Sequence, residues 1–374
     1  MDTIRLNLEL ENKKHLLYHD YLIKEEKEEL LNFINDNSYL SEESFPKSIM
    51  MRQELKANNL IEGINNDLKD INNVIVRRHS NMDKKERQRI INLYHGYKYV
   101  LKKKEINKET LRELYNILSK DILEKEDRVR MGKYYRTDNV YILKGGRLDI
   151  DPFLGMKSER LDYFMDMFLD YVNSNSKDSG IEEFIKSQVM HFYFVYIHPY
   201  FDVNGRTSRT VSMWYLLNNK CYPYTIFNSA ITYSRPNYDK AIEKSRTGDV
   251  TYFLRYMLIC VLEALEKDYV IRDINNNSKY KMNAEEKEII EYLLTMKGNF
   301  TAKDLSSTYN RYNEPKKYNY ILKNLIMPLI DKEIIEVLNY TKNKNNMKIT
   351  INNNLLDIDN PKIKHISLDK FKQK

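Results

Sequence analysis

The run HPYFDVNGRTSR at residues 198–209 brings together the side-chain types that phosphate chemistry requires. His198 carries an imidazole whose ordinary pKa suits a general base. Asp202 offers a hard oxygen ligand for Mg²⁺. Arg206 and Arg209 are three residues apart, so on a helix they lie on one face, where two guanidiniums can bind a polyphosphate. The run therefore predicts a site for a phosphate-bearing substrate.

The elements around this run place its residues at the start of a helix. The apolar segment QVMHFYFVYIH predicts a helix that Pro199 ends, because proline disfavours helical backbone at the residue before it. A second helix is expected from about Arg206, and Asn204-Gly205 forms the turn between them. Backbone N–H groups in such a turn join the positive end of the helix dipole and favour an anion. Each feature taken alone is also explained by structure: a helix stop, a turn and a solvated face.

The joint pattern resembles the signature of the Fic family, H-P-F-x-[DE]-G-N-G-R-x-x-R. Two positions depart from it: Tyr200 replaces Phe, and Val203 replaces Gly. A β-branched residue disfavours positive φ, so we expect ordinary backbone angles at Val203 or a slightly altered turn. The related Doc kinases carry Lys at the position of Gly205, so this glycine favours nucleotidyl transfer over phosphorylation.

The resemblance implies a specific reaction. His198 would deprotonate a Ser, Thr or Tyr hydroxyl of a target protein, and that oxygen would attack the α-phosphate of ATP with loss of pyrophosphate. Asp202 would hold Mg²⁺ (or Mn²⁺). The expected product is an AMPylated target, which includes the protein itself. The residues expected to bind nucleotide or phosphate are Asp202, Val203, Asn204, Gly205, Arg206, Thr207, Ser208, Arg209 and Tyr238.

The resemblance extends over about residues 105–267. The alternating segment 134–150, with Gly145-Gly146 near its middle, predicts a β-hairpin that resembles the family's flap. Its target-binding edge would be Val140, Tyr141, Ile142 and Leu143, which would hold a peptide by strand addition. Tyr238 and the later Gly248-Asp249 resemble part of the family's adenosine pocket.

A third resemblance lies upstream, in a helix expected over about residues 48–63, capped by Ser48 and stopped by Gly63. Asn58 to Gly63 resembles the inhibitory motif [ST]-x-x-x-E-[GN], with Asn58 in place of Ser or Thr. The resemblance implies that Glu62 pairs with Arg209, occupies the place of the γ-phosphate and inhibits the enzyme. Some relatives with this glutamate also remove AMP. Alone, Glu-Gly at a helix end is an ordinary helix stop.

The sequence as a whole predicts a mainly α-helical protein. It has 374 residues, of which 42% are hydrophobic, with only 10 Gly and 8 Pro, which argues against a turn-dense all-β protein. We expect an N-terminal helical region over 1–104, a Fic core over 105–270, a linker over 272–283 and a winged-helix-like domain over 284–374. Core helices are expected at 24–36, 84–103, 108–122, 156–174, 181–198, 206–219, 235–246 and 249–267. The C-terminal order is three helices and a hairpin.

Composition also bears on compartment and partners. Two cysteines and an N-terminus without a signal-like apolar core favour the cytoplasm, and the apolar stretch 252–265 is too short to span a membrane. A net charge of +7 permits nucleic acid as a partner without requiring it. DNA contact by 284–374 would use Lys316, Lys317, Lys323, Lys342 and Lys344. A homodimer is compatible with the sequence.

Two alternatives stay open at this stage. In one, Val203 has spoiled the phosphate-binding turn, and the chain is a non-enzymatic regulator whose winged helix binds nucleic acid. In the other, the same residues use a different donor, such as UTP, GTP or a CDP-alcohol.

Overall fold

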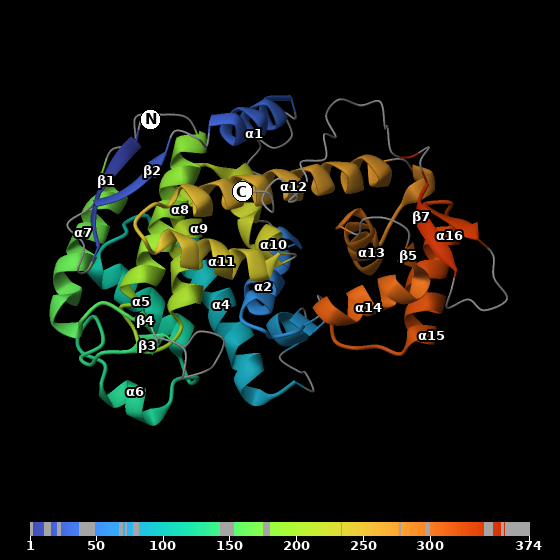
Figure 1. Cartoon of the computed structure of the whole chain (residues 1–374). Helices are drawn as coiled ribbons and strands as arrows, with labels where there is room; N and C mark the ends of the chain where they lie inside the picture. The colour runs from blue at the N-terminus through green and yellow to red at the C-terminus, as the bar shows by residue number, and fades with distance from the viewer. Residues whose placement is uncertain are drawn as a thin grey trace.

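The protein is mainly α-helical, as the composition predicts (Figure 1). The computed structural model describes residues 3–10, 16–20, 24–36, 49–66, 70–71, 73–77, 82–142, 153–174, 180–232, 234–276, 278–295, 300–339, 347–352 and 355. Before the C-terminal part, its helices are α1 (Lys24–Asp36), α2 (Ile49–Ile61), α4 (Lys84–Lys102), α5 (Lys108–Ser119), α6 (Lys125–Val129), α7 (Leu161–Asn173), α8 (Gly180–Ile197), α9 (Asn204–Asn218), α10 (Phe227–Thr232), α11 (Arg235–Ser245) and α12 (Thr251–Asn276), with a π-helical turn at Asn73–Arg77. Short 3₁₀ turns lie at Ser158–Arg160, Tyr222–Ile226 and Ser278–Tyr280.

Helix boundaries follow the local sequence signals closely. Asn107 caps α5: its side-chain oxygen accepts from the Thr110 amide, and the Thr110 hydroxyl oxygen accepts from the Asn107 amide. This reciprocal capping satisfies N–H groups that the first helical turn leaves without partners. The same device starts α14 at Thr301 and Asp304. Gly63 follows α2 with φ +79°, which glycine adopts without steric cost.

The long helix α12 corrects one expectation. The sequence predicted its end near residue 267 and a polar linker over 272–283, but α12 continues to Asn276. Val270 and Ile274 are buried on its later turns and pack in a second apolar core. A first core gathers buried residues from Leu8 to Leu265, and the second gathers those from Val270 to Ile351. Helix α12 therefore runs from one core into the other (Figure 1).

Most of the second core belongs to a C-terminal module, residues 284–351, against which Val270, Ile274 and Met282 pack. Its helices are α13 (Ala284–Thr295), α14 (Ala302–Tyr312), α15 (Tyr318–Ile321) and α16 (Met327–Asp331), with a π-helical turn at Leu322–Ile326 between the last two. The strands β5 (Phe300–Thr301), β7 (Lys348–Ile351) and β6 (Ile335–Asn339) form one antiparallel sheet in that order. Strand β5 was not predicted, and it places α14 directly against the sheet.

Two further strand pairs lie in the N-terminal part. Strands β1 (Thr3–Glu9) and β2 (Leu16–Asp20) form an antiparallel pair that the sequence reading missed. In the flap, β3 (Tyr141–Ile142) pairs with β4 (Phe153–Leu154). The expected hairpin over 134–150 is thus displaced: its return strand comes later, and Leu143, Gly145 and Gly146 lie outside the described residues. No described helix combines the length and the apolarity needed to cross a bilayer.

Candidate active site

The loop between α8 and α9 carries His198 at its start. Helix α8 ends at Ile197, and His198 takes φ +55°, which turns the chain away from the helix axis before Pro199. The imidazole Nδ1 lies 3.4 Å from the Val195 carbonyl oxygen. The pKa of His198 is lowered to about 4, mainly by burial and to a smaller extent by the nearby Arg136 and Arg246, against the Val195 hydrogen bond, which raises it. At neutral pH this histidine is uncharged and can accept a proton.

The loop is braced by side chains that the sequence reading had assigned to phosphate. Asn204 Oδ1 accepts from the Tyr200 amide at 3.0 Å, and its Nδ2 donates to the Tyr200 carbonyl at 2.8 Å. The Thr207 hydroxyl donates to the Val203 carbonyl, and the Ser208 hydroxyl donates to the Gly205 carbonyl. These three side chains shape the turn, so their contribution to anion binding is limited to backbone groups.

Val203 adopts the backbone that its side chain disfavours. Its φ is +67° and its ψ is +11°, and it caps the N-terminus of α9. The expectation of ordinary angles at this position is therefore wrong. The Val203 side chain is buried and its carbonyl accepts from Thr207, so packing and capping hold the left-handed conformation. Such a conformation costs roughly 1–2 kcal/mol for a residue other than glycine.

The two arginines of the run point their charge into the interior. Arg206 is 5% exposed and Arg209 is 2% exposed. Within the described part of the chain, Nε and Nη1 of Arg206 have no hydrogen-bond partner. A buried guanidinium with unpaired N–H groups is costly unless an anion completes it. This pair of donors is the strongest indication of an absent anionic ligand.

Asp202 lies at the exposed lip of the same loop. Its Oδ1 accepts from the Val203 amide at 2.6 Å. Among the described residues there is no group of three or more His, Cys, Asp or Glu that could hold a metal ion. The donor set still fits Mg²⁺ that arrives with a nucleotide, since this ion commonly uses one carboxylate, substrate phosphates and water.

Helix α2 delivers a carboxylate to Arg209. Glu62 Oε1 lies 2.5 Å from Arg209 Nη2, and Glu62 Oε2 lies 3.8 Å from Arg206 Nη2. Partial burial opposes the charge on Glu62, but the guanidiniums of Arg209 and Arg206 outweigh it and hold its pKa below the ordinary value. A Cβ on Gly205 would lie only 3.0 Å from Glu62 Oε1, so the carboxylate sits directly against the start of α9.

Asn58 completes the clamp on Arg209. Its Oδ1 accepts from Nε at 3.0 Å and from Nη2 at 2.7 Å. Its own Nδ2 donates to the Tyr97 hydroxyl at 3.3 Å. Asn58 therefore provides an acceptor for Arg209 at the position where the inhibitory motif that it resembles has Ser or Thr.

The site also has a buried polar wall and a flap. The Tyr238 hydroxyl lies 2.8 Å from Nε2 of the buried His191. Arg136 anchors the base of the flap: its Nε donates to the His198 carbonyl at 2.9 Å, and its Nη1 donates to the Asp138 carbonyl at 2.6 Å. The Gly155 amide donates to the Val140 carbonyl, which joins the two sides of the flap near β3 and β4.

Several of these residues escaped the sequence reading as parts of the site. Arg136 was not predicted as a site residue, and Asn58 was noted only as a departure from a motif. Glu54 and Tyr97, which flank the clamp, carried no signal at all. The structure describes Val140 of the predicted target-binding edge, and it describes the backbone of Tyr141 and Ile142. Leu143 lies outside the described residues.

The chain is similar in sequence to known proteins over part of its length. Residues 105–216 match the Fic/DOC family. The chain is 31% identical over 169 residues to proteins named protein adenylyltransferase Fic from Drosophila mojavensis and Drosophila willistoni, a match that covers 44% of this chain and 31% of each relative. It thus spans about a third of the length of these curated relatives.

Solved structures share the fold at low sequence identity. A Fic family protein from Desulfovibrio desulfuricans G20 matches with a TM-score of 0.56 and 18% identity, over 89% of this chain and 96% of that one. A fragment of Fic-1 from C. elegans matches with a TM-score of 0.51 and 17% identity, over 66% of this chain and 72% of that one.

Proposed function

We propose that this chain is a Fic family protein and that its active centre transfers AMP from ATP to a hydroxyl group of a target protein, with its own hydroxyls as one target. One observation carries the proposal furthest. Arg206 holds two buried guanidinium nitrogens without partners beside a helix N-terminus, and the uncharged His198 opens the same loop. A polyphosphate would complete the guanidinium, and the histidine would accept a proton beside it.

Each residue then has a defined part. His198 takes the proton of a Ser, Thr or Tyr hydroxyl, whose oxygen forms a bond to the α-phosphorus as the bond to the pyrophosphate breaks. The start of α9, with the backbone of Gly205 and the guanidinium of Arg206, binds phosphate oxygens. Arg209 binds the γ-phosphate once Glu62 has left it. Tyr238 borders the nucleoside, and the flap around Val140 holds the target peptide.

The proposed metal is Mg²⁺ or Mn²⁺. Asp202 would hold it, and the ion would supply positive charge that neutralises the negative charge developing on the leaving pyrophosphate. The exposed position of Asp202 at the lip of the loop supports this assignment, because the phosphates and water can supply the remaining ligands.

We propose that Glu62 inhibits the transfer. Its carboxylate takes the Arg209 fork and lies against Gly205, so a nucleotide cannot place its γ-phosphate there. Asn58 strengthens the inhibited arrangement because it gives Arg209 a second acceptor. ATP would then bind only with its α-phosphate out of line for attack.

The other assignments concern the rest of the chain. We propose a Fic core over about 105–270 and a winged-helix domain from 284, on the basis of the second core and the helices and three-stranded sheet around it. Both cysteines are buried thiols outside any disulfide, which supports a reducing cytoplasm. DNA binding gains no support from Lys316, whose Nζ lies 3.1 Å from the Tyr309 hydroxyl within the module.

Intact-mass spectrometry of Glu62→Gly protein tests the donor. The protein is incubated with Mg²⁺ and, in separate samples, ATP, UTP, GTP or CTP, beside a Glu62→Gly/His198→Ala control. Addition of one AMP mass from ATP, absent in the control, is the expected result. Addition of a different nucleotide or of phosphate alone would establish another donor reaction. The absence of any addition, together with salt-sensitive binding of duplex DNA by the full chain, would favour the regulator.

A further inference from the structure

The inhibitory helix α2 is held between two parts of the protein, through two different faces. Glu54, Asn58 and Glu62 follow one another at four-residue spacing, so they lie along one side of the helix. Lys56 is two residues from both Glu54 and Asn58, which places it on nearly the opposite side. The first side meets Arg209 and α10, and the second meets the C-terminal module.

The contact on the second side is a buried charged network. Lys56 Nζ lies 2.9 Å from Glu288 Oε1 on α13 and 2.6 Å from Asn313 Oδ1 at the end of α14. Asn313 Nδ2 in turn donates to the Tyr292 hydroxyl at 2.8 Å and to the Tyr309 carbonyl at 3.1 Å. Both side chains of the ion pair are only 8% exposed. We call this network, Lys56 with Glu288, Tyr292 and Asn313, the Lys56 latch.

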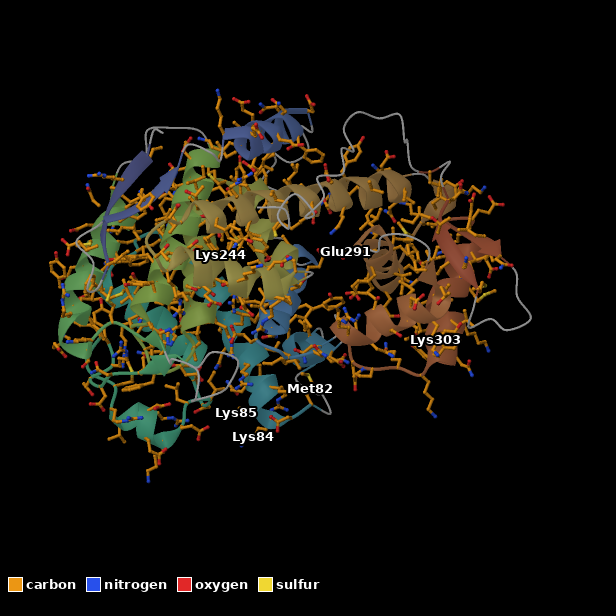
Figure 2. The ribbon with its side chains drawn as sticks, viewed as in Figure 1. Met82, Lys84, Lys85, Lys244, Glu291 and Lys303 are labelled. Atoms are coloured by element: carbon orange, nitrogen blue, oxygen red, sulfur yellow. The ribbon has the colours of Figure 1, made fainter. Side chains whose placement is uncertain are left out.

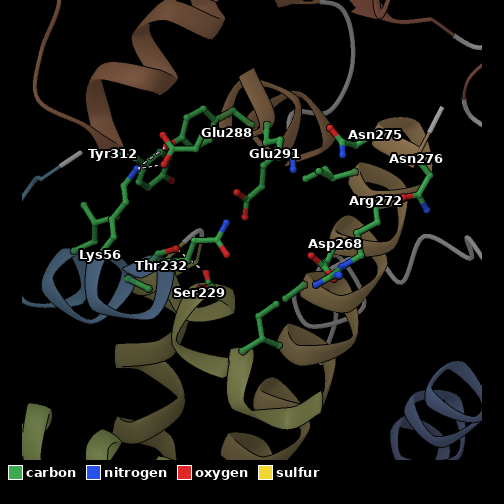
Figure 3. A pocket seen from close by; sticks show the side chains of 18 residues that line it. Lys56, Ser229, Thr232, Asp268, Arg272, Asn275, Asn276, Glu288, Glu291 and Tyr312 are labelled. Carbon is green, nitrogen blue, oxygen red and sulfur yellow. Dashed lines mark hydrogen bonds and ion pairs between the residues drawn. The ribbon is translucent and has the colours of Figure 1, made fainter. Parts of the chain in front are cut away.

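A cavity of about 350 Å³ adjoins the latch. From α2 it is lined by Gln53, Lys56, Ala57 and Leu60, and its other walls come from α10, α12 and α13. Figure 3 shows the dashed contact between Lys56 and Glu288 at one side of this space, with Ser229 and Glu291 facing it from different elements. In Figure 2, Glu291 lies where the Fic core and the C-terminal module meet. Side chains therefore leave part of the space between α2 and the module unfilled beside the latch.

The buried ion pair makes the two parts interdependent. Removing one partner of such a pair leaves an uncompensated charge, which is strongly unfavourable. If the module shifts and Glu288 leaves, the Lys56 ammonium loses its counter-charge and the module no longer holds α2 in place, which favours a movement of α2. The other face of α2 carries Asn58 and ends at Glu62, so a movement of this rigid helix withdraws both acceptors from Arg209.

We propose that the Lys56 latch lets the C-terminal module hold α2 in the inhibiting position, so that a ligand or partner that draws Glu288 or Asn313 away from Lys56 activates the enzyme. The proposal rests on the proposed AMP transfer and names how that site is regulated. The module thus acts as a regulatory domain of the active centre, whatever ligand it binds. Because the coupling is reciprocal, release of Glu62 also loosens the latch.

The test compares two neighbouring carboxylates of α13 in the full chain. Glu288→Gln breaks the latch. Glu286→Gln is the control, because Glu286 is a buried carboxylate of the same helix that pairs at 2.7 Å with the partly exposed Lys332 inside the module instead of with α2. The rate of AMP addition to each protein is followed by intact-mass spectrometry with ATP and Mg²⁺. Glu288→Gln is expected to raise the rate about fivefold or more over the parent, the usual lower bound of such coupling, and Glu286→Gln is expected to leave it unchanged.

Epistasis separates this idea from simple destabilisation. In a Glu62→Gly background the inhibitor is already gone, so Glu288→Gln should add nothing. Lys56→Met should activate as Glu288→Gln does, and the double variant should not exceed the more active single variant, because both remove one contact. Equal rates for Glu288→Gln and Glu286→Gln, beside an active Glu62→Gly protein, would overturn the latch and leave the proposed function intact.

Hydrogen exchange gives a readout that does not depend on catalysis. Amides of residues 53–64 should exchange faster in Glu288→Gln protein than in Glu286→Gln protein at matched stability. If Glu62→Gly protein adds no nucleotide at all, the proposed function fails, but faster exchange over 53–64 would still support the latch. Unchanged exchange there would overturn it.

Discussion

Glu62 Oε1 lies 2.5 Å from Arg209 Nη2, and this ion pair joins the end of α2 to the first turns of α9 across 147 positions of sequence. The two residues come from segments that share no local interaction, so only the folded chain brings them together. The carboxylate satisfies the donor that the proposed reaction needs for the γ-phosphate. The same contact therefore stabilises the helix pairing and blocks the site.

Replacing Asn58 should release part of the inhibition. Asn58→Leu keeps the approximate side-chain volume but removes the oxygen that accepts from Nε and Nη2 of Arg209. Hydrogen bonds to charged groups contribute about 1.5–3 kcal/mol, and Glu62 remains in place. We expect AMP addition faster than in the parent and slower than in Glu62→Gly, measured by intact mass.

Asn59→Leu serves as the control for this variant, because Asn59 is equally buried and bonds Asn66 instead of Arg209. If Asn59→Leu activates as much as Asn58→Leu, the effect comes from loosening α2 in general, and the specific role of Asn58 is wrong.

The pH dependence of catalysis should reflect the buried state of His198. Because burial lowers its pKa to about 4, the imidazole is already deprotonated throughout the range from pH 5 to pH 8. The base is lost only when pH falls through the lowered pKa. In Glu62→Gly protein we expect kcat/KM to be level between about pH 5 and 8 and to fall below that range. An inflection of kcat/KM near pH 6.5 that persists when other titratable residues are substituted would contradict this buried environment of His198.

Val203→Gly tests whether Val203 only strains the backbone of the loop or disables the active site. Glycine takes φ +67° without penalty, while loss of the buried valine side chain costs packing. These effects oppose each other, so we expect a change in unfolding free energy of about 1 kcal/mol or less, and retained AMP transfer in the Glu62→Gly background. Chemical denaturation and the mass assay measure the two quantities. Activity that appears only after Val203→Gly would show that Val203 disables the parent site.

Glu54 should make the protein less stable as pH rises. Burial raises its pKa to about 7, against hydrogen bonds from Ser229 and Asn228, so the folded state holds a proton that the unfolded state has lost. With an ordinary pKa of 4.5 in the unfolded chain, stability falls progressively from about pH 4.5 to pH 7 and stays lower above it. The change is on the order of 3 kcal/mol.

Thermal melting of Glu54→Gln protein checks this sign. The variant should melt higher than the parent at pH 8 and close to the parent at pH 5, where Glu54 is protonated in the fold. An equal difference at both pH values would show that the titration of Glu54 is not the cause.

The parts of the fold and of the site that depend on local sequence signals could be predicted from the sequence. The helix stop at Gly63 and the turn before α9 were predicted from the sequence, because each depends on neighbouring residues in the chain. The extension of α12 was not predicted, because Val270 and Ile274 are surrounded in the sequence by polar residues. Their burial depends on the second core, which forms only in the folded chain.

The site was predicted by residue type more reliably than by role. Asn204, Thr207 and Ser208 lie in the first turns of α9, but their side chains bond the backbone of this turn and of the preceding loop. Spacing alone cannot distinguish this role from phosphate binding. The contacts of Lys56 with Glu288 and Asn313 span more than 230 positions and carry no local signature. Such long-range contacts require the tertiary structure.

The most direct test of the account compares the rate of AMP addition in the parent and in Glu62→Gly protein, at saturating ATP and Mg²⁺, with Glu62→Gly/His198→Ala as the control. Loss of a partly buried ion pair that blocks Arg209 should raise the rate at least tenfold, which corresponds to about 1.4 kcal/mol. The control should show no addition. A Glu62→Gly protein that adds AMP no faster than the parent would contradict inhibition by the Glu62–Arg209 pair.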